Sequence, residues 1–286
     1  MRLAGSATLL ASALAAAVLV ALAVKPELRA ALLAQFNDPA SLPSLPEDPR
    51  VHYEPAARAC AAAAAAALPG AVAKIEAEHG RPFARPPIVG VFADFATYAR
   101  ANGLGDDNVA GVSRAGRAML SPVMCREEYW RLASVLAHEL SHVHFFGWRP
   151  RGAARPPLWF TEGLAVLASD GGAAETVSDA DAAKAIRDGY SILLDDSAWM
   201  NFLSIPFAAE PPCGEGCVRQ SFRQRMAYRQ ASLFIGWLRA RDPAAFSRLM
   251  RALEGGAAFG PSFEAAFDGS PRQRWADFAK SLQASR

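Results

Sequence analysis

The five residues His138-Glu139-Leu140-Ser141-His142 form the most informative motif of the sequence, His-Glu-x-x-His. They lie in a run from Tyr129 to Phe146 whose apolar residues recur every three or four positions, and that period predicts a helix. Residues four apart lie on one face of a helix, so His138 and His142 can present two imidazole nitrogens to one metal ion. Glu139 lies about 100° further around the helix, where it can act as a general base.

A second motif supplies a candidate third ligand, Glu162, within the segment Pro-Leu-Trp-Phe-Thr-Glu-Gly-Leu-Ala at 157–165. The stretch 147–157 is rich in Gly, Pro and Arg and predicts a loop, and 158–168 predicts a second helix beside the first. Three protein ligands leave the fourth position of a zinc ion open for water, which is typical of catalytic sites. The alternative is a helix with two surface histidines, and the apolar surroundings disfavour it.

Together, these two motifs resemble those of the gluzincin metallopeptidases, of the peptidase-MA-like type. The matching residues are His138, Glu139, His142 and Glu162, in a Trp-Phe-x-Glu-Gly-x-Ala setting, and the resemblance runs loosely from about Pro86 to the C-terminus. It implies an α+β, zincin-like fold, in which a small mixed sheet and the active-site helix precede a mainly helical C-terminal lobe. It also implies zinc held by the two histidines and Glu162, with Glu139 as the base.

The sequence departs from the gluzincin pattern in two places. Aminopeptidase members carry a Gly-x-Met-Glu-Asn segment, but the corresponding stretch at 111–120 has no glutamate, so an endopeptidase is expected. Some members also place Asp four residues after the glutamate ligand, as a partner for a histidine. That position is Val166 here, which leaves Asp170 as a candidate.

The resemblance adds two expectations about substrate. Gluzincins often carry a tyrosine at the distance of Tyr228 beyond the glutamate ligand, where its hydroxyl can donate to a developing oxyanion. A core tyrosine is the alternative for Tyr228, and Tyr190 is the rival candidate. The strand before the motif helix borders the cleft in such folds, so 118–121 could pair with an extended substrate backbone, or form an ordinary sheet edge.

The N-terminus predicts export. Arg2 precedes an uncharged run, Leu3–Val24, that is long enough to span a bilayer, and Ala21-Leu22-Ala23 has the small-x-small form of a cleavage site. Residues 1–24 are therefore expected to be a signal peptide or a membrane anchor, on the periplasmic side of the cell envelope. The proline-rich stretch 25–55 predicts a tether.

Residues 56–286 are then the peptidase domain, with an α+β part at 56–147 and a helical part at 148–286. Within it, the sequence predicts a helix that ends near Pro69-Gly70 and then a helical continuation, in which His79 is expected to interact with the helix dipole rather than to bind a metal. A strand is predicted at 86–92. The next predicted elements are a helix capped by Asp94, a hairpin around Ala115-Gly116, and an amphipathic helix at 218–241. The acidic stretch 173–215 is expected to cover one side of the cleft. Asp242-Pro243 and Ser270-Pro271-Arg272-Gln273 are helix starts.

The four cysteines and the net charge limit which class of protein this chain can be. In an exported chain, Cys60, Cys125, Cys213 and Cys217 can form two disulfides in three pairings, and Cys213–Cys217 with Cys60–Cys125 is preferred over four free thiols. A net charge of +2 on 286 residues gives no reason to expect a nucleic-acid partner.

The sequence therefore predicts an exported or membrane-tethered zinc peptidase that acts on a peptide or protein. A non-enzymatic, peptidase-like binding module of the cell envelope is one alternative, and the intact Glu139 counts against it. A zinc hydrolase of a non-peptide amide, such as cell-wall material, is the other.

Overall fold

A computed structural model of the chain describes residues 23–194 and 205–284, so residues 1–22 of the predicted export segment lie outside the described part. The chain divides into two compact units. The sheet unit comprises the described residues up to Ala65 together with Ile88–Tyr129, and the helical unit comprises Ala66–Pro87 and the described residues from Trp130 onward. The protein is 59% helical, with one small mixed sheet in the described residues and a helical C-terminal part, which confirms the predicted fold class.

The sheet has five strands in the order β1-β2-β3-β5-β4. β2 pairs in parallel with β3 and β3 in parallel with β5, whereas the outer pairs β1–β2 and β4–β5 are antiparallel. The strands are β1 (Ser44–Leu45), β2 (Asp48–Tyr53), β3 (Ile88–Val91), β4 (Gly111–Arg114) and β5 (Arg117–Leu120).

The predicted hairpin joins β4 to β5, and its turn residues Ala115 and Gly116 have positive φ angles of 49° and 79°. Positive φ at both turn residues matches the right-handed twist of the strands. The expectation that 118–121 pairs with substrate is wrong, because β5 already pairs with β3 on one side and β4 on the other. Among the described strands, β4 rather than β5 forms that edge of the sheet.

The prediction of a tether over 25–55 is also wrong for much of its length. Residues 26–33 form helix α2 (Pro26–Leu33), and β1 and β2 belong to the sheet, where Val51 is fully buried. Two of the prolines in this stretch, Pro39 and Pro55, instead begin the 3₁₀ helices Pro39–Ser41 and Pro55–Ala57, and Pro49 lies within β2. Proline suits a first helical turn because its missing N–H has no partner there anyway.

Short helices complete the sheet unit. Helix α4 (Phe95–Asn102) begins as predicted, because the Asp94 side chain accepts a hydrogen bond from the Thr97 amide at 2.8 Å, and it ends at Gly103 with φ of 79°. Helix α5 (Pro122–Arg126) carries Cys125, which forms the preferred disulfide with Cys60. The other preferred disulfide, Cys213–Cys217, is also present.

Helix α3 (Arg58–His79) is one continuous helix, so the predicted end near Pro69-Gly70 is wrong. Pro69 removes one backbone hydrogen bond, but Leu68 and Ile75 on either side of it are fully buried and favour continuation. Among the described residues, the stretch Pro55–His79 is long and apolar enough to cross a membrane by length and composition, and buried core helices also meet that criterion.

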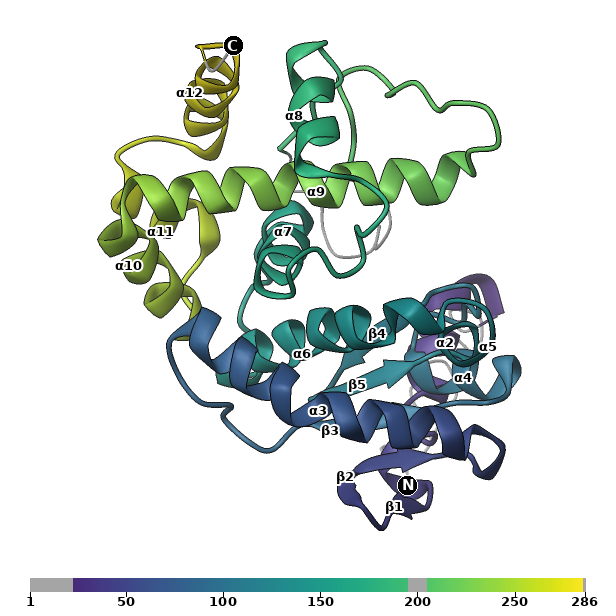
Figure 1. The fold of residues 1–286 in the computed structure, drawn as a ribbon. Helices are drawn as coiled ribbons and strands as arrows, with labels where there is room; N and C mark the ends of the chain where they lie inside the picture. Colours follow the sequence, from purple (N-terminus) through teal and green to yellow (C-terminus); the bar gives the residue numbers. More distant parts are fainter. Residues whose placement is uncertain (1–22, 195–204, 285–286) are drawn as a thin grey trace, which may run out of the picture. The chain divides into compact units, whose positions relative to one another are not determined.

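The helical unit contains seven named α-helices in its described residues from Trp130 onward. Figure 1 shows the long α9 (Arg219–Arg241) with α7 (Leu158–Ala168) on one side and α8 (Asp179–Arg187) on the other. The others are α6 (Leu132–Trp148), α10 (Pro243–Glu254), α11 (Phe259–Phe267) and α12 (Pro271–Ala284). Their large core is rich in aromatic side chains, including the fully buried Phe160, Phe234 and Phe263.

The predicted helix starts in this unit are confirmed. Asp242 caps α10 by accepting from the Ala245 amide at 2.8 Å, and Ser270 and Gln273 form the reciprocal capping box of α12. Helix α8 was not predicted, although Ser178 and Asp181 form a capping box at its start. A capping box is a recognised signal of a helix start, but the acidic composition of 173–215 favoured a loop in the prediction.

The division of the chain differs from the predicted boundary at 147/148. Helix α6 belongs with the C-terminal helices rather than with the sheet, because it packs against α7 and α10. Both predicted motifs therefore lie within the helical unit.

Candidate metal centre

Helix α6 carries the His-Glu-x-x-His motif in a buried setting. It begins at Leu132 rather than Tyr129, after a 3₁₀ turn at Tyr129–Arg131. Trp130, within the run that predicts the helix, is 65% exposed and so gives no packing reason for the helix to start earlier. His138, Glu139 and His142 are all buried, as expected of a helix that is apolar around most of its circumference.

Helix α7 brings Glu162 to the two histidines. Glu162 Oε2 lies 3.2 Å from His138 Nε2 and 3.4 Å from His142 Nε2, and the two imidazole nitrogens are 3.2 Å apart. All three side chains are buried. We call this group, His138, His142 and Glu162, the motif cluster.

The motif cluster fits a tetrahedral metal ion in both donors and spacing. Zinc binds imidazole nitrogen and carboxylate oxygen at about 2.0–2.2 Å, which places ligand atoms of a tetrahedral site about 3.3–3.5 Å apart. The three separations of 3.2, 3.2 and 3.4 Å lie close to that range. Three protein donors leave one coordination position open, as in catalytic zinc sites.

A backbone carbonyl fixes the orientation of His138. Its Nδ1 lies 3.0 Å from the oxygen of Gly172 and must donate, because a carbonyl oxygen only accepts. In a neutral imidazole the other nitrogen, Nε2, then carries a free lone pair toward Glu162. Asp170, the candidate for this role, instead forms an ion pair with Lys74.

The loop that carries Gly172 is shaped by glycine. A Cβ atom at Gly172 would lie 2.2 Å from the carbonyl oxygen of Ser134 in α6, so no other residue fits without displacing the loop. Glu175 then fastens the loop, because its carboxylate accepts from Ser134 Oγ at 2.7 Å, from Arg131 Nε at 2.9 Å, and from the Ala173 amide at 3.1 Å. The Asp-Gly-Gly at 170–172 could have signalled this tight approach, but the sequence analysis missed both Gly172 and Glu175.

Glu139 is placed in surroundings that suit a general base. Burial raises the pKa of its carboxyl, the two histidines of the motif cluster oppose that effect, and the charge of Glu162 reinforces it. A carboxyl pKa moved upward, toward neutrality, makes proton uptake and release more nearly balanced at working pH.

Glu162 and His142 stabilise each other as a charged pair. Burial alone raises the pKa of Glu162, but the charge of His142 and the close contacts of both imidazoles with the carboxylate outweigh it, and the pKa is lowered. Burial lowers the pKa of His142, but the Glu162 charge and hydrogen bond outweigh it in turn, and that pKa is raised. In the metal-free protein the carboxylate of Glu162 is therefore ionised, and a metal ion would have to displace the proton of His142 before that imidazole could bind it.

Tyr228 of α9 lies beside the motif cluster. Its ring is nearly parallel to that of His138, with centroids 6.2 Å apart, and its hydroxyl accepts a hydrogen bond from Gln224 Nε2 at 3.3 Å. Burial, reinforced by the charge of Glu162, raises the pKa of Tyr228 well above its usual value, so the hydroxyl keeps its proton. The rival Tyr190 packs at the margin of the helical core.

A close approach of two helices positions Tyr228. A Cβ atom at Gly163 would lie 2.7 Å from the Ala231 backbone carbon of α9, so the residue next to Glu162 must be glycine for α7 and α9 to pack this tightly. Because Ala231 is less than one turn beyond Tyr228, this contact between α7 and α9 also sets how closely Tyr228 approaches Glu162.

The remaining histidines of this region lie apart from the motif cluster. His144 does not join it, because it follows His142 by two positions and so lies about 200° around the helix. The predicted role of His79 as a charged partner of the helix dipole is wrong, because burial together with the charges of His144, His142 and Arg239 lowers its pKa to about 3. A neutral ring gains little from the dipole.

Comparison with known proteins adds no family. No family model matches the chain, and no curated protein sequence matches it closely enough to count as a relative. The function of the chain is therefore inferred from the geometry of the site.

Proposed function

We propose that this chain is a zinc-dependent peptidase of the gluzincin type, an endopeptidase exported to or tethered in the cell envelope. The observation that carries the proposal is the convergence of three buried donor atoms, separated by 3.2–3.4 Å, with Glu139 buried beside them. A zinc ion bound there would supply Lewis acidity, which activates a water molecule and polarises the scissile carbonyl.

The proton steps fall to Glu139. Its carboxylate takes the proton of the attacking water and then delivers it to the amine nitrogen that leaves. The raised pKa of Glu139 serves both halves of this exchange, because a carboxyl with an ordinary pKa would return the proton poorly.

Two other residues position or stabilise the reacting groups. Tyr228, with its proton retained, donates a hydrogen bond to the oxyanion that forms as the carbonyl is attacked. The Gly172 carbonyl keeps the imidazole of His138 in the tautomer that presents Nε2 to the centre.

The disulfides support the proposed location. Two bonds, Cys60–Cys125 and Cys213–Cys217, use every cysteine of the chain. Disulfides of this kind persist in oxidising compartments such as the periplasm. The proposed partners are accordingly a peptide or protein substrate and, through the N-terminal segment, the membrane.

The deciding experiment compares the wild type with Glu139→Gln on casein, with metal content measured in parallel. We expect the variant to keep its zinc and to lose about 10²–10⁴-fold in rate, because only the base is removed. Glu78→Gln is the matched control, since its carboxylate pairs with Arg239 elsewhere in the helical unit and should leave the rate unchanged. Equal casein hydrolysis by the wild type and Glu139→Gln would refute the mechanism.

The same preparations distinguish the two alternatives. A binding module would hydrolyse neither casein nor peptidoglycan fragments. A hydrolase of cell-wall amides would cleave the fragments, and would lose that activity in Glu139→Gln.

A further inference from the structure

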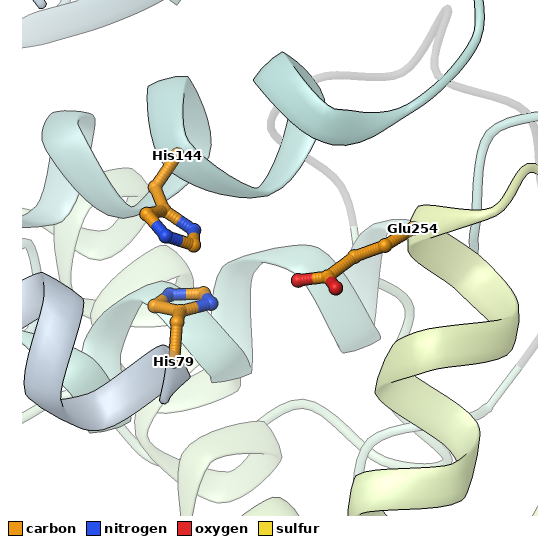
Figure 2. Close-up of side chains that lie close together, drawn as sticks. All are labelled: His79, His144 and Glu254. Atoms are coloured by element: carbon orange, nitrogen blue, oxygen red, sulfur yellow. The ribbon is translucent and has the colours of Figure 1, made fainter. Parts of the chain in front are cut away.

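A second group of metal-binding side chains lies elsewhere on α6. His79 comes from the end of α3, His144 from α6 and Glu254 from the end of α10, and each offers a ligand atom within 4.8 Å of the others. Figure 2 shows the two imidazole rings facing each other, with the Glu254 carboxylate directed toward them. The ring centroids are 4.4 Å apart. We call this group, His79, His144 and Glu254, the second cluster.

One polar atom of each of the three side chains contacts a neighbouring residue. His144 Nε2 lies 3.0 Å from the carbonyl oxygen of Arg81 and donates to it, and His79 Nε2 lies 2.9 Å from Ser141 Oγ. The guanidinium of Arg81 binds one carboxylate oxygen of Glu254, Oε2. These contacts fix the orientation of all three side chains.

Each of the three side chains also has one polar atom without a hydrogen-bond partner among the described residues. Nδ1 of His79, Nδ1 of His144 and Oε1 of Glu254 are buried and make no hydrogen bond in the described part of the chain. Because His144 donates through Nε2, its neutral ring carries a lone pair on Nδ1. Buried polar atoms are nearly always paired, so unpaired atoms on all three members of one cluster indicate an occupant.

We propose that His79, His144 and Glu254 bind a second divalent transition metal ion, independent of the peptidase centre. Two imidazole nitrogens and a carboxylate oxygen are donors that zinc prefers. A proton shared between two of the three atoms would leave the third unpaired, whereas one cation in contact with all three would satisfy each of them. The neighbouring cations already have partners, because Arg81 pairs with Glu254 and Arg239 pairs with Glu78.

The role of this ion is structural. It ties the ends of α3 and α10 to α6, the helix that carries His138 and His142. Ser141, which holds His79, lies between those two histidines in the motif. The second cluster therefore braces the helix on which the peptidase centre is built.

Metal content of the full-length protein tests the proposal. We expect two equivalents of zinc in the wild type and one in the double variant His138→Gln/His142→Gln, whose motif cluster is disabled. Adding Glu254→Gln to the double variant should remove the remaining equivalent. Glu264→Gln, at an exposed position of α11 outside both clusters, should retain it.

Two results would overturn the second site: a double variant that binds no zinc, or one whose zinc survives Glu254→Gln. Thermal unfolding covers the case in which the triple variant does not fold. The double variant should then melt at a higher temperature with zinc than with EDTA, because a ligand that binds only the folded state stabilises it. Identical melting temperatures would also overturn the proposal. None of these outcomes depends on peptidase activity, so the proposed function is tested separately.

Discussion

The motif cluster and the second cluster have the same donor set, two histidines and a glutamate, and each takes at least one histidine from α6. Around the motif cluster lie a buried carboxyl with a raised pKa, Glu139, and a tyrosine hydroxyl, Tyr228. Around the second cluster, the hydrogen bonds and ion pairs of the described residues come from Ser141 and Arg81, which fix the orientation of its side chains. On the two proposals above, the same donor set would serve different roles because of the proton-transferring groups beside it.

The largest expected difference between the clusters comes from Glu162→Ala. Loss of one of three ligands should release the zinc of the motif cluster and abolish peptidase activity, while the second cluster keeps its ion. Zinc analysis should fall from two equivalents to one. A variant that retains both equivalents would show that Glu162 is not a ligand.

The contrast between clusters also shows what sequence can predict. The shared face of His138 and His142 is predictable because a helix converts a spacing of four into one face, and the helix starts at Asp94 and Asp242 are predictable because capping is local. Glu162 followed from a second motif close by in the chain.

What the sequence missed depends on contacts between distant residues. His79, His144 and Glu254 are each unremarkable in sequence and meet only when three helices pack. The Gly172 carbonyl carries no side-chain signal at all, and the strands at 44–53 are short and proline-flanked, so they resemble a linker.

Tyr228→Phe should have the next largest effect, and only on chemistry. Removing one oxyanion donor costs about 10²–10³-fold in rate, while both zinc equivalents should remain. The kinetic signature is a lower kcat with little change in KM, because the hydrogen bond forms in the transition state. Tyr190→Phe is the matched control and should leave kcat unaltered. If Tyr228→Phe kept the wild-type kcat, Tyr228 would have no part in catalysis and would only pack in the core.

Gly172→Ala should weaken the motif cluster without touching its ligands. The added methyl group would overlap the Ser134 carbonyl, so the loop must move and the bond from His138 Nδ1 must lengthen. Loss of such a supporting contact typically costs about 10–100-fold in metal affinity. Competition with a chelator would measure it, with Gly70→Ala as control because a Cβ atom there meets nothing within 4 Å. The zinc of the second cluster should be held as in wild type, and equal weakening of both sites would contradict a local effect.

The smallest expected effect is on the pH dependence of stability, through Glu175. Burial raises its pKa, but the hydrogen bond from Ser134 and the charge of Arg131 outweigh it, so the folded pKa lies below the usual 4.5. A depressed carboxyl pKa stabilises the fold above the unfolded value, and that stability is lost as pH falls through the folded value. Glu175→Gln should therefore cost about 1–2 kcal/mol at pH 7 and progressively less below pH 4.5.

Urea unfolding of the metal-free wild type and variant at several pH values would show whether the difference in their free energies of unfolding shrinks as the pH falls. Asp179→Asn is the control, because that carboxylate is 69% exposed and its pairing with Arg229 should contribute little. Since Glu175 fastens the loop that carries Gly172, Glu175→Gln should also loosen zinc at the motif cluster and not at the second cluster. A wild type and variant that differ by the same free energy at every pH would mean that Glu175 acts through packing rather than through its charge.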